Sequence, residues 1–332
     1  MSGTTQRRVT ASDIAQAVGV SRATVGFVLN NTPGQKISDG TRERVMAAAA
    51  RLGYRPHRAA QTLARGNSRI VLFVMPDWPL EHNMRRYLDE AAHVLDEAGY
   101  SMIAYTRHPG DRSRPLWESL DADVAVGFPA FDADTVASLR AAGVTNIYPD
   151  PSGSAPLPGI TAGTKLQVEH LFEIGHRRLA FAAVPDPRLA ALNEQRLTAA
   201  RQAAEQLGLG EVGACTVDHR DGSAVAAVEA WHDAGVTGVV AYNDDVAAAV
   251  AGAALRAGLA IPGDISIVGH DDSPLAALFV PALTSVRMNS AGLGRFVAQQ
   301  ALHLAEGRPA PQAVADVRVN LVARESSAPP AG

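Results

Sequence analysis

The sequence of 332 residues contains a single cysteine, Cys215, and few aromatic residues, 5% of the total. One cysteine excludes an internal disulfide and a cysteine zinc cluster, so a reducing compartment is expected. The first ten residues contain no apolar run of signal-peptide length. The longest apolar stretch, residues 246–255, is rich in alanine and too short to cross a bilayer. We therefore expect a cytoplasmic protein without a membrane span.

The sequence also lacks the common signatures of catalysis. It contains no Gly-x-Ser-x-Gly elbow, no His-Glu-x-x-His and no complete phosphate-binding loop. The run from Gly159 to Lys165 has the wrong spacing for such a loop, and Gly292-Leu293-Gly294 lacks the third glycine of a dinucleotide site. The ten histidines are scattered without metal-ligand spacing. We therefore expect no enzymatic activity, no cofactor and no bound metal.

What the sequence does have is an uneven distribution of charge. The formal net charge is −4. Residues 1–66, however, contain ten Lys or Arg against three Asp or Glu, a net charge of +7, which leaves −11 for the remainder. A basic head on an acidic body indicates a polyanion-binding module joined to a domain with another task. Charge alone leaves open a basic surface that only contacts solvent.

The basic head has the pattern of three short helices. Thr10 and Ser21 are expected to cap the first two helices, and Gly19 is expected to end the first. Ala15 supplies the small residue that two tightly crossing helices need where they touch. A third helix is expected to start near Ser38. This order of residues is typical of a helix-turn-helix.

From residue 69 onward, short apolar runs alternate with amphipathic helices. Such runs are typical of strands that are buried on both faces of a parallel sheet, and the alternation predicts doubly wound α/β architecture. Residues 69–77 resemble residues 178–186, which predicts two similar subdomains that face each other across a cleft. The expected strands are residues 70–75, 101–105, 124–128, 146–149, 179–184, 239–242 and 265–268.

Several separate blocks, in the right order, resemble the lactose-repressor (LacI/GalR) family of transcriptional regulators. The resemblance spans residues 9–325 and implies a homodimeric repressor. It also implies that a small-molecule effector, a sugar or related metabolite, controls its affinity for a near-palindromic double-stranded DNA operator. The blocks are residues 9–30, 41–54 with Pro56, Ala60 and Leu63, then 163–165, 169–171, 175–178, 243–244, 262–272 and 281–286.

The expected architecture is an α/β chain with a three-helix helix-turn-helix head, a hinge and a periplasmic-binding-protein-like body. Residues 1–54 form the DNA-binding domain, residues 55–66 the hinge helix, residues 67–325 the effector-binding and dimerisation domain, and residues 326–332 a disordered tail. Within the body, the N-subdomain is expected over residues 67–158 plus 288–318 and the C-subdomain over residues 159–287 plus 319–325.

The second helix of a helix-turn-helix reads base edges in the major groove with residues near its start. Arg22 can donate two hydrogen bonds to guanine, and hydroxyls at helix starts suit phosphate oxygens, although they can serve as caps alone. Most family members have a Ser-Arg pair where this chain has Gly26-Phe27. Phe27 either packs on a thymine methyl or turns inward. The expected DNA-binding residues of the head are Thr10, Ser21, Arg22, Ala23, Thr24, Gly26, Phe27, Asn30, Ser38, Thr41 and Tyr54.

The resemblance extends the DNA interface into the hinge. Leu63 matches the leucine that the family wedges into the minor groove, and Ala60 is small enough for two hinges to pack closely. His57 is a third hinge residue expected to contact DNA. The alternative for Leu63 is ordinary packing against the body.

Effectors of doubly wound sheets bind where the carboxyl ends of the strands meet the cleft. By resemblance, Arg196, Asn243 and Asp271 match positions at which the family contacts its effector. For any single carboxylate, a helix cap or turn role is the alternative. A sugar-binding protein without a regulatory role, or a hydrolase or kinase acting on the ligand, are the competing functions. Further candidates that follow strands are Asp77, Phe128, Asp150 and His219.

Overall fold

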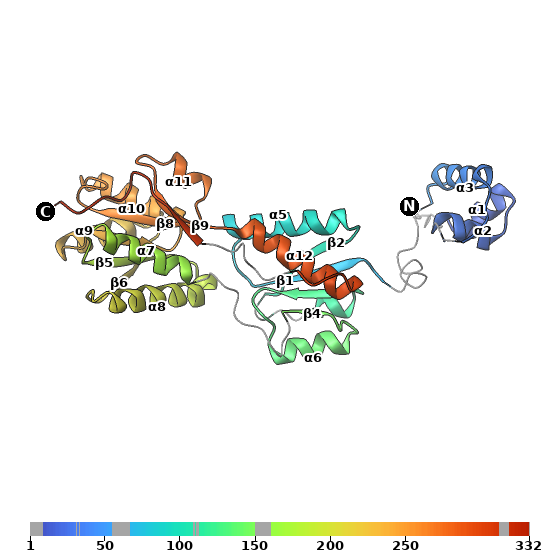
Figure 1. Cartoon of the computed structure of the whole chain (residues 1–332), viewed down its shortest axis with the longest axis horizontal. Coiled ribbons are helices and arrows are strands. Elements are labelled where there is room, and N and C mark those ends of the chain that lie inside the picture. Colours follow the sequence, from blue (N-terminus) through green and yellow to red (C-terminus); the bar gives the residue numbers. More distant parts are fainter. Residues whose placement is uncertain are drawn as a thin grey trace, which may run out of the picture. The chain divides into compact units, whose positions relative to one another are not determined.

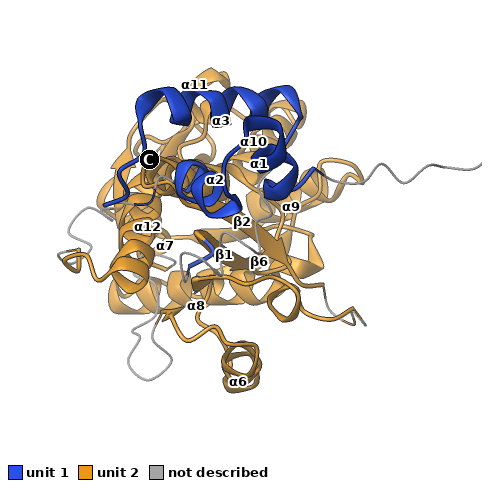
Figure 2. Cartoon of the chain, turned by 90° about the vertical axis from the view of Figure 1, so that its right-hand side faces the viewer, with its two compact units in different colours: residues 1–68 blue, residues 69–332 orange. Residues whose placement is uncertain are grey.

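A computed structural model of the chain describes residues 9–30, 32, 34–54, 67–108, 110, 113–149, 161–311 and 319–331 (Figure 1). The chain divides into two compact units, Met1–Ser68 and Arg69–Gly332 (Figure 2). The hinge candidates His57, Ala60 and Leu63 and the effector candidate Asp150 lie outside the described residues. No helix of the described segments has the length and hydropathy that a membrane crossing needs.

The first unit contains the three expected helices, each capped as the sequence predicts. Thr10 accepts a hydrogen bond from the amide of Asp13, whose carboxylate accepts one in return from the amide of Thr10 at 2.7 Å. Gly19 ends the first helix at φ +73°, a conformation that favours glycine. The serine caps are Ser21 and Ser38. The helices are α1 (Ala11–Val18), α2 (Arg22–Leu29) and α3 (Asp39–Arg51).

One small core holds these three helices together. Each helix contributes two or three buried apolar side chains, and three of the seven are alanines, which let the helix backbones approach closely. Arg44 of α3 donates a hydrogen bond of 2.6 Å to the carbonyl of Val18, at the end of α1. The core consists of Ile14, Ala15, Val25, Val28, Val45, Ala48 and Ala49.

The second unit contains two lobes, each built on one sheet. The sheet of the first lobe is parallel, in the order β2-β1-β3-β4. Alternate residues of β1 pack on α5 and α12 on one side and against α6 on the other, which explains the continuous apolar run. The elements are β1 (Ile70–Met75), α5 (His82–Glu97), β2 (Ser101–Thr106), η1 (Leu116–Glu118), β3 (Val124–Gly127), α6 (Ala133–Ala141), β4 (Ile147–Tyr148) and α12 (Ser290–Glu306).

The sheet of the second lobe has the order β10-β9-β8-β7-β5-β6 and is parallel except for β10. Its helices cover both faces, as the doubly wound prediction requires (Figure 1). The elements are α7 (Ala162–Glu173), β5 (Leu179–Ala183), η2 (Pro187–Leu189), α8 (Ala190–Gln206), β6 (Gly213–Thr216), α9 (Ser223–Asp233), β7 (Gly238–Ala241), α10 (Asp244–Arg256), β8 (Ser266–His270), α11 (Pro274–Leu278), β9 (Thr284–Met288) and β10 (Val319–Val322).

The chain returns to the first lobe through α12, which follows directly after β9 of the second lobe. Gly294 of α12 lies against α5, where an added Cβ would stand 2.3 Å from the carbonyl oxygen of Tyr87. Gly292 and Gly294, which lack the third glycine of a dinucleotide site, belong to the start of a closely packed helix. Because β10 then rejoins the second sheet, α12 connects the two lobes at both of its ends.

The expected disordered tail is wrong for residues 326–331. Ser326 is fully buried, and its hydroxyl donates to the carbonyl of Ile267 at 2.6 Å and accepts from the amide of Thr284 at 2.8 Å. The amide of Ala328 donates to the hydroxyl of Ser266 at 3.1 Å. Hydrogen bonds rather than apolar contacts order this segment. The Ser/Ala/Pro composition therefore does not indicate that the segment is ordered.

Replacement of Ser326 by alanine is expected to lower the free energy of unfolding by about 1–3 kcal/mol, because it leaves two buried backbone groups without their partner. Chemical denaturation of the full chain measures this loss. Ser119→Ala, which removes an exposed hydroxyl, is the matched control and should change stability little. Equal stability of the two variants would contradict the role given to Ser326.

Candidate functional site

The first candidate site is the solvent-facing side of α2. Ser21, Arg22 and Ala23 are exposed at its start, whereas Gly26 and Phe27 one turn later are half-buried. The buried stripe of the helix faces the other way, toward the core of the head. This is the geometry that a recognition helix needs, with a free side that begins at its N-terminus.

The hydroxyls expected to touch phosphate serve first as helix caps. The Ser21 hydroxyl accepts from the amide of Thr24 at 3.0 Å, and the Ser38 hydroxyl accepts from the amide of Thr41 at 3.4 Å. Lone pairs and exposed edges of these groups remain available to a phosphate. Of the other candidates, Thr10 is exposed, Asn30 follows the end of α2, and Tyr54 packs partly against the head core.

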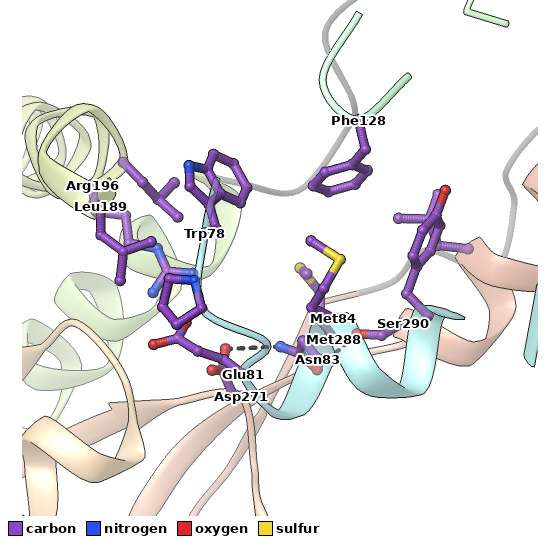
Figure 3. A pocket seen from close by; sticks show the side chains of 14 residues that line it. Trp78, Glu81, Asn83, Met84, Phe128, Leu189, Arg196, Asp271, Met288 and Ser290 are labelled. Carbon is purple, nitrogen blue, oxygen red and sulfur yellow. Dashed lines mark hydrogen bonds between the residues drawn. The ribbon is translucent and has the colours of Figure 1, made fainter. Parts of the chain in front are cut away.

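The second candidate site is a cavity of about 90 Å³ where the two lobes of the second unit meet. Figure 3 shows polar side chains gathered on one side of it and aromatic side chains on the other. The polar side is formed by Glu81, Asn83, Arg196, Asp271 and Ser290. The apolar side is formed chiefly by Trp78, Met84, Tyr87, Phe128 and Leu293.

Asp271 is the point on the polar side where both lobes converge. Its carboxylate accepts a hydrogen bond from Asn83 of the first lobe at 2.8 Å (Figure 3). It accepts another from Nδ1 of the buried His270 at 2.7 Å. The hydroxyl of Ser290 in turn donates to the Asn83 carbonyl oxygen at 2.7 Å. Asp271 has φ +101°, a conformation that costs a non-glycine residue about 1–3 kcal/mol. The strained backbone directs this side chain toward the cavity.

The protonation states of this pair follow from its surroundings. Burial opposes ionisation of Asp271, but the His270 hydrogen bond and the charge of Arg196 outweigh it and hold the pKa of the carboxyl below its ordinary value. Burial lowers the pKa of His270, so its ring is neutral. A neutral ring that donates from Nδ1 leaves the ionised carboxylate as the acceptor.

Arg196 lies beside Asp271 and retains an unused donor. Its guanidinium stacks on the ring of Tyr242, 4.4 Å from the ring centre, and Nη1 donates to the Tyr242 carbonyl. Its Nε and the hydroxyl of Tyr87 are buried without a hydrogen-bond partner in the described part of the chain. Because an unsatisfied buried donor costs about 1–3 kcal/mol, a polar ligand that reached these atoms would gain that energy.

Glu81 forms a second bridge between the lobes. Its carboxyl accepts a hydrogen bond of 3.0 Å from the side-chain amide of Asn243. Burial, together with the negative charge of Asp271, raises the pKa of Glu81 to about 7. The other end of the Asn243 amide caps α10 by accepting from the amide of Val246 at 2.9 Å. Asn243 is therefore a helix cap that also reaches the opposite lobe.

Glu81 also separates the inner cavity from a larger outer one of about 560 Å³. Asn243 and His219 line the outer cavity, whereas Arg196, Asp271 and Phe128 line the inner one. Asp77 is instead paired with His108 at 3.0 Å. The described residues contain no group of three or more His, Cys, Asp or Glu that could hold a metal ion.

Sequence reasoning missed Glu81, Asn83 and Ser290. Glu81 and Asn83 follow the end of β1, and Ser290 follows the end of β9, so all three lie beyond carboxyl ends of strands. The rule that placed the other candidates would have found them had it covered the whole connection after each strand and the first turn of the helix that follows, rather than only the residues next to the strand.

The raised pKa of Glu81 predicts that stability falls as pH rises from about 4.5 to about 7, because only the folded state holds this proton there. The loss is on the order of 3 kcal/mol. Glu81→Gln keeps the hydrogen-bond acceptor and removes the titration. The melting temperature of the variant minus that of the wild type should therefore increase between pH 5 and pH 8. Glu194→Gln, on the exposed side of α8, is the control. Parallel pH profiles for Glu81→Gln and wild type would contradict the assignment.

Comparison with known proteins agrees with this geometry. The family model described as bacterial regulatory proteins, lacI family, matches residues 10–57, and the periplasmic binding protein-like domain matches residues 168–327. The HTH-type transcriptional regulator MalR of Streptomyces coelicolor is 34% identical, over 96% of each chain. The lactose operon repressor of Escherichia coli is 28% identical, over 90% of this chain and 86% of that protein.

Solved structures show the same fold over almost the whole chain. A lac repressor dimer bound to operator and an anti-inducer is similar with a TM-score of 0.75 and 24% identity, covering 97% of this chain and 100% of that one. The transcriptional regulator CelR in complex with cellobiose has a TM-score of 0.61 and 26% identity, covering 96% and 100%. With its helix-turn-helix head and two-lobed body, the chain belongs to the lacI family of bacterial regulatory proteins.

Proposed function

We propose that this chain is a repressor that binds a near-palindromic DNA operator as a homodimer and responds to a sugar or related metabolite bound between its lobes. The observation that carries the proposal is the cavity at which Arg196 and Asp271 of one lobe meet Glu81 and Asn83 of the other. A ligand there contacts both lobes at once. The basic head, a separate compact unit, supplies the DNA-binding surface.

The two sides of the cavity suit a polyhydroxylated ring. Carboxylate, amide and guanidinium groups make directional hydrogen bonds to hydroxyls, and they lie opposite aromatic rings that can cover the C–H face of a sugar. Trp78 and Phe128 meet edge to face with their ring centres 5.9 Å apart. The cellobiose complex of CelR is a precedent for a sugar in this family.

The volume of the inner cavity favours a ligand that extends outward. Small-molecule sites usually enclose about 300–1,000 Å³, whereas the inner cavity has about 90 Å³ and the outer cavity about 560 Å³. Glu81 and Leu189 line both cavities. We infer that the effector displaces the Glu81 side chain, releases Asn243 and occupies both spaces.

Regulation follows from competition for the same polar groups. The bridges from Asn83 to Asp271 and from Asn243 to Glu81 hold the lobes in one arrangement. An effector that takes over these hydrogen bonds changes which arrangement is favoured. A ligand shifts such an equilibrium only by its difference in affinity for the two states. Through the hinge, the arrangement of the lobes then sets how well two heads fit one operator.

A dimer is supported by exposed apolar side chains on the second lobe. Leu278 and Val280, at and just after the end of α11, are 78% and 80% exposed. Large exposed apolar side chains close in the sequence are typical of a surface that another protein covers. A second copy of the chain is the proposed partner, because a homodimer relates two heads by two-fold symmetry. Such a pair of heads matches the nearly palindromic operator proposed above.

We further propose that the chain catalyses no reaction on its effector and acts in the cytoplasm. The MalR and lactose operon proteins are regulators rather than enzymes. A protein that regulates a bacterial chromosome must reach the DNA.

Selection of operator DNA from random duplexes, followed by a screen of sugars for release or tightening of that DNA, tests the proposal. Arg196→Ala is expected to raise the sugar concentration needed for the response by about 10- to 100-fold, since it removes a charged hydrogen-bond donor. Operator affinity without sugar should stay unchanged. Arg201→Ala, an exposed position on the same helix, is the control. A wild-type response from Arg196→Ala would exclude this cavity as the effector site.

A further inference from the structure

Phe27 occupies an unusual place for a phenylalanine. The buried side chains of α2 are Val25 and Val28, which face α1 and α3. At helical spacing Phe27 points away from both, and it is not among the residues that form or cover the head core in the described chain. The described core of the head therefore does not include Phe27. A half-buried aromatic ring lies on the surface that the proposed function turns toward DNA.

Ala23 extends this apolar surface toward the start of the helix. Residues four apart share a helix face, so the exposed Ala23 and the half-buried Phe27 lie one above the other. The only charged side chain beside them on α2 is Arg22. The free side of the helix thus presents a short apolar strip next to one guanidinium.

Gly26 removes the side chain that would otherwise stand beside Phe27. A Cβ built at Gly26 meets nothing within 4 Å, so no neighbour in the described head requires glycine there. Glycine inside a helix costs about 1 kcal/mol relative to alanine. A position where glycine is unfavourable for the helix and unnecessary for packing indicates close approach by something outside the head.

The major groove offers one apolar group to such a strip. Thymine carries a C5 methyl, whereas the other base edges there present hydrogen-bond donors and acceptors that a phenyl ring cannot satisfy. We propose that Phe27, with Ala23, reads thymine methyl groups in each half of the operator, and that Gly26 allows α2 to approach the bases closely enough for this contact. This inference rests on the proposed function, because it requires α2 to dock in the major groove.

The test uses the full chain and an operator selected from random duplexes. Each thymine is replaced in turn by deoxyuridine, which deletes the methyl group and leaves base pairing unchanged. At one or two positions in each half-site, the loss of the methyl should weaken binding by about fourfold, the factor that corresponds to one buried methyl-sized group. Because the protein is unaltered in this arm, a change in its folding cannot explain the result.

Protein variants assign the effect to Phe27. Phe27→Ala should bind the thymine operator more weakly and become insensitive to deoxyuridine at those positions. Arg22→Ala should lose affinity but keep the full sensitivity to the methyl. Phe27→Arg, which restores the family's residue, should shift the selected base at that position toward guanine.

The outcomes separate this inference from the proposed function. If the chain selects no sequence at all, the proposed function fails. If it selects an operator in which no deoxyuridine weakens binding, or if Phe27→Ala remains as sensitive as the wild type, the proposal that Phe27 reads thymine methyl groups is wrong. The proposed regulatory function is then unaffected.

Discussion

The arrangement of the second unit depends on one buried carboxylate. Asp271 sits at the end of β8 in a strained backbone conformation and accepts hydrogen bonds from its neighbour His270 and from Asn83 of the opposite lobe. Two charged groups, Asp271 and Arg196, share a site that is nearly closed to water. Asp271 is held by hydrogen bonds from His270 and Asn83 and by the nearby charge of Arg196, whereas Arg196 donates to the Tyr242 carbonyl. A polar ligand that offers hydrogen bonds to both groups would therefore change the contacts at this site.

The Glu81 carboxyl can be protonated or ionised where the two lobes meet. A carboxyl with a pKa of about 7 is partly protonated near neutral pH, so small changes in its surroundings alter its charge. The bridge from Asn243 to Glu81 is therefore sensitive to the protonation of Glu81, and Glu81 lines both cavities. An effector that enters from the outer cavity meets this bridge first and the Asp271 junction afterwards.

Local signals made much of the fold predictable from the sequence. Helix caps such as Thr10 and Ser21 depend on residues only a few positions apart, and a buried strand such as β1 is a continuous apolar run. Strands β6, β9 and β10 were not among the expected strands. β6 and β10 lie at sheet edges and are partly exposed, and β9 mixes Thr, Ser and Arg with its apolar residues, so none of the three is a continuous apolar run. Ser326 is held by hydrogen bonds, which leave no apolar pattern in the sequence.

The residues of the candidate site, like the strands, were predictable from the sequence only in part. Arg196 and Asp271 could be named because they match family positions, and the structure brings them together. Glu81 and Asn83 were missed because they lie further along the chain from the end of β1 than the residues directly after the strand, which were the ones considered. Asp77 follows a strand as expected but is satisfied by His108 at the surface. A position directly after a strand is therefore not sufficient to place a residue in the cavity.

In the proposed regulation, effector and operator act on one equilibrium between arrangements of the lobes. Calorimetric titration of the effector into the free chain and into the operator complex tests it most directly. Since coupling between two ligands is reciprocal, the effector Kd should differ between the two titrations by the same factor by which the effector changes the operator Kd. An effector that binds the free chain and the complex with equal affinity would contradict the account.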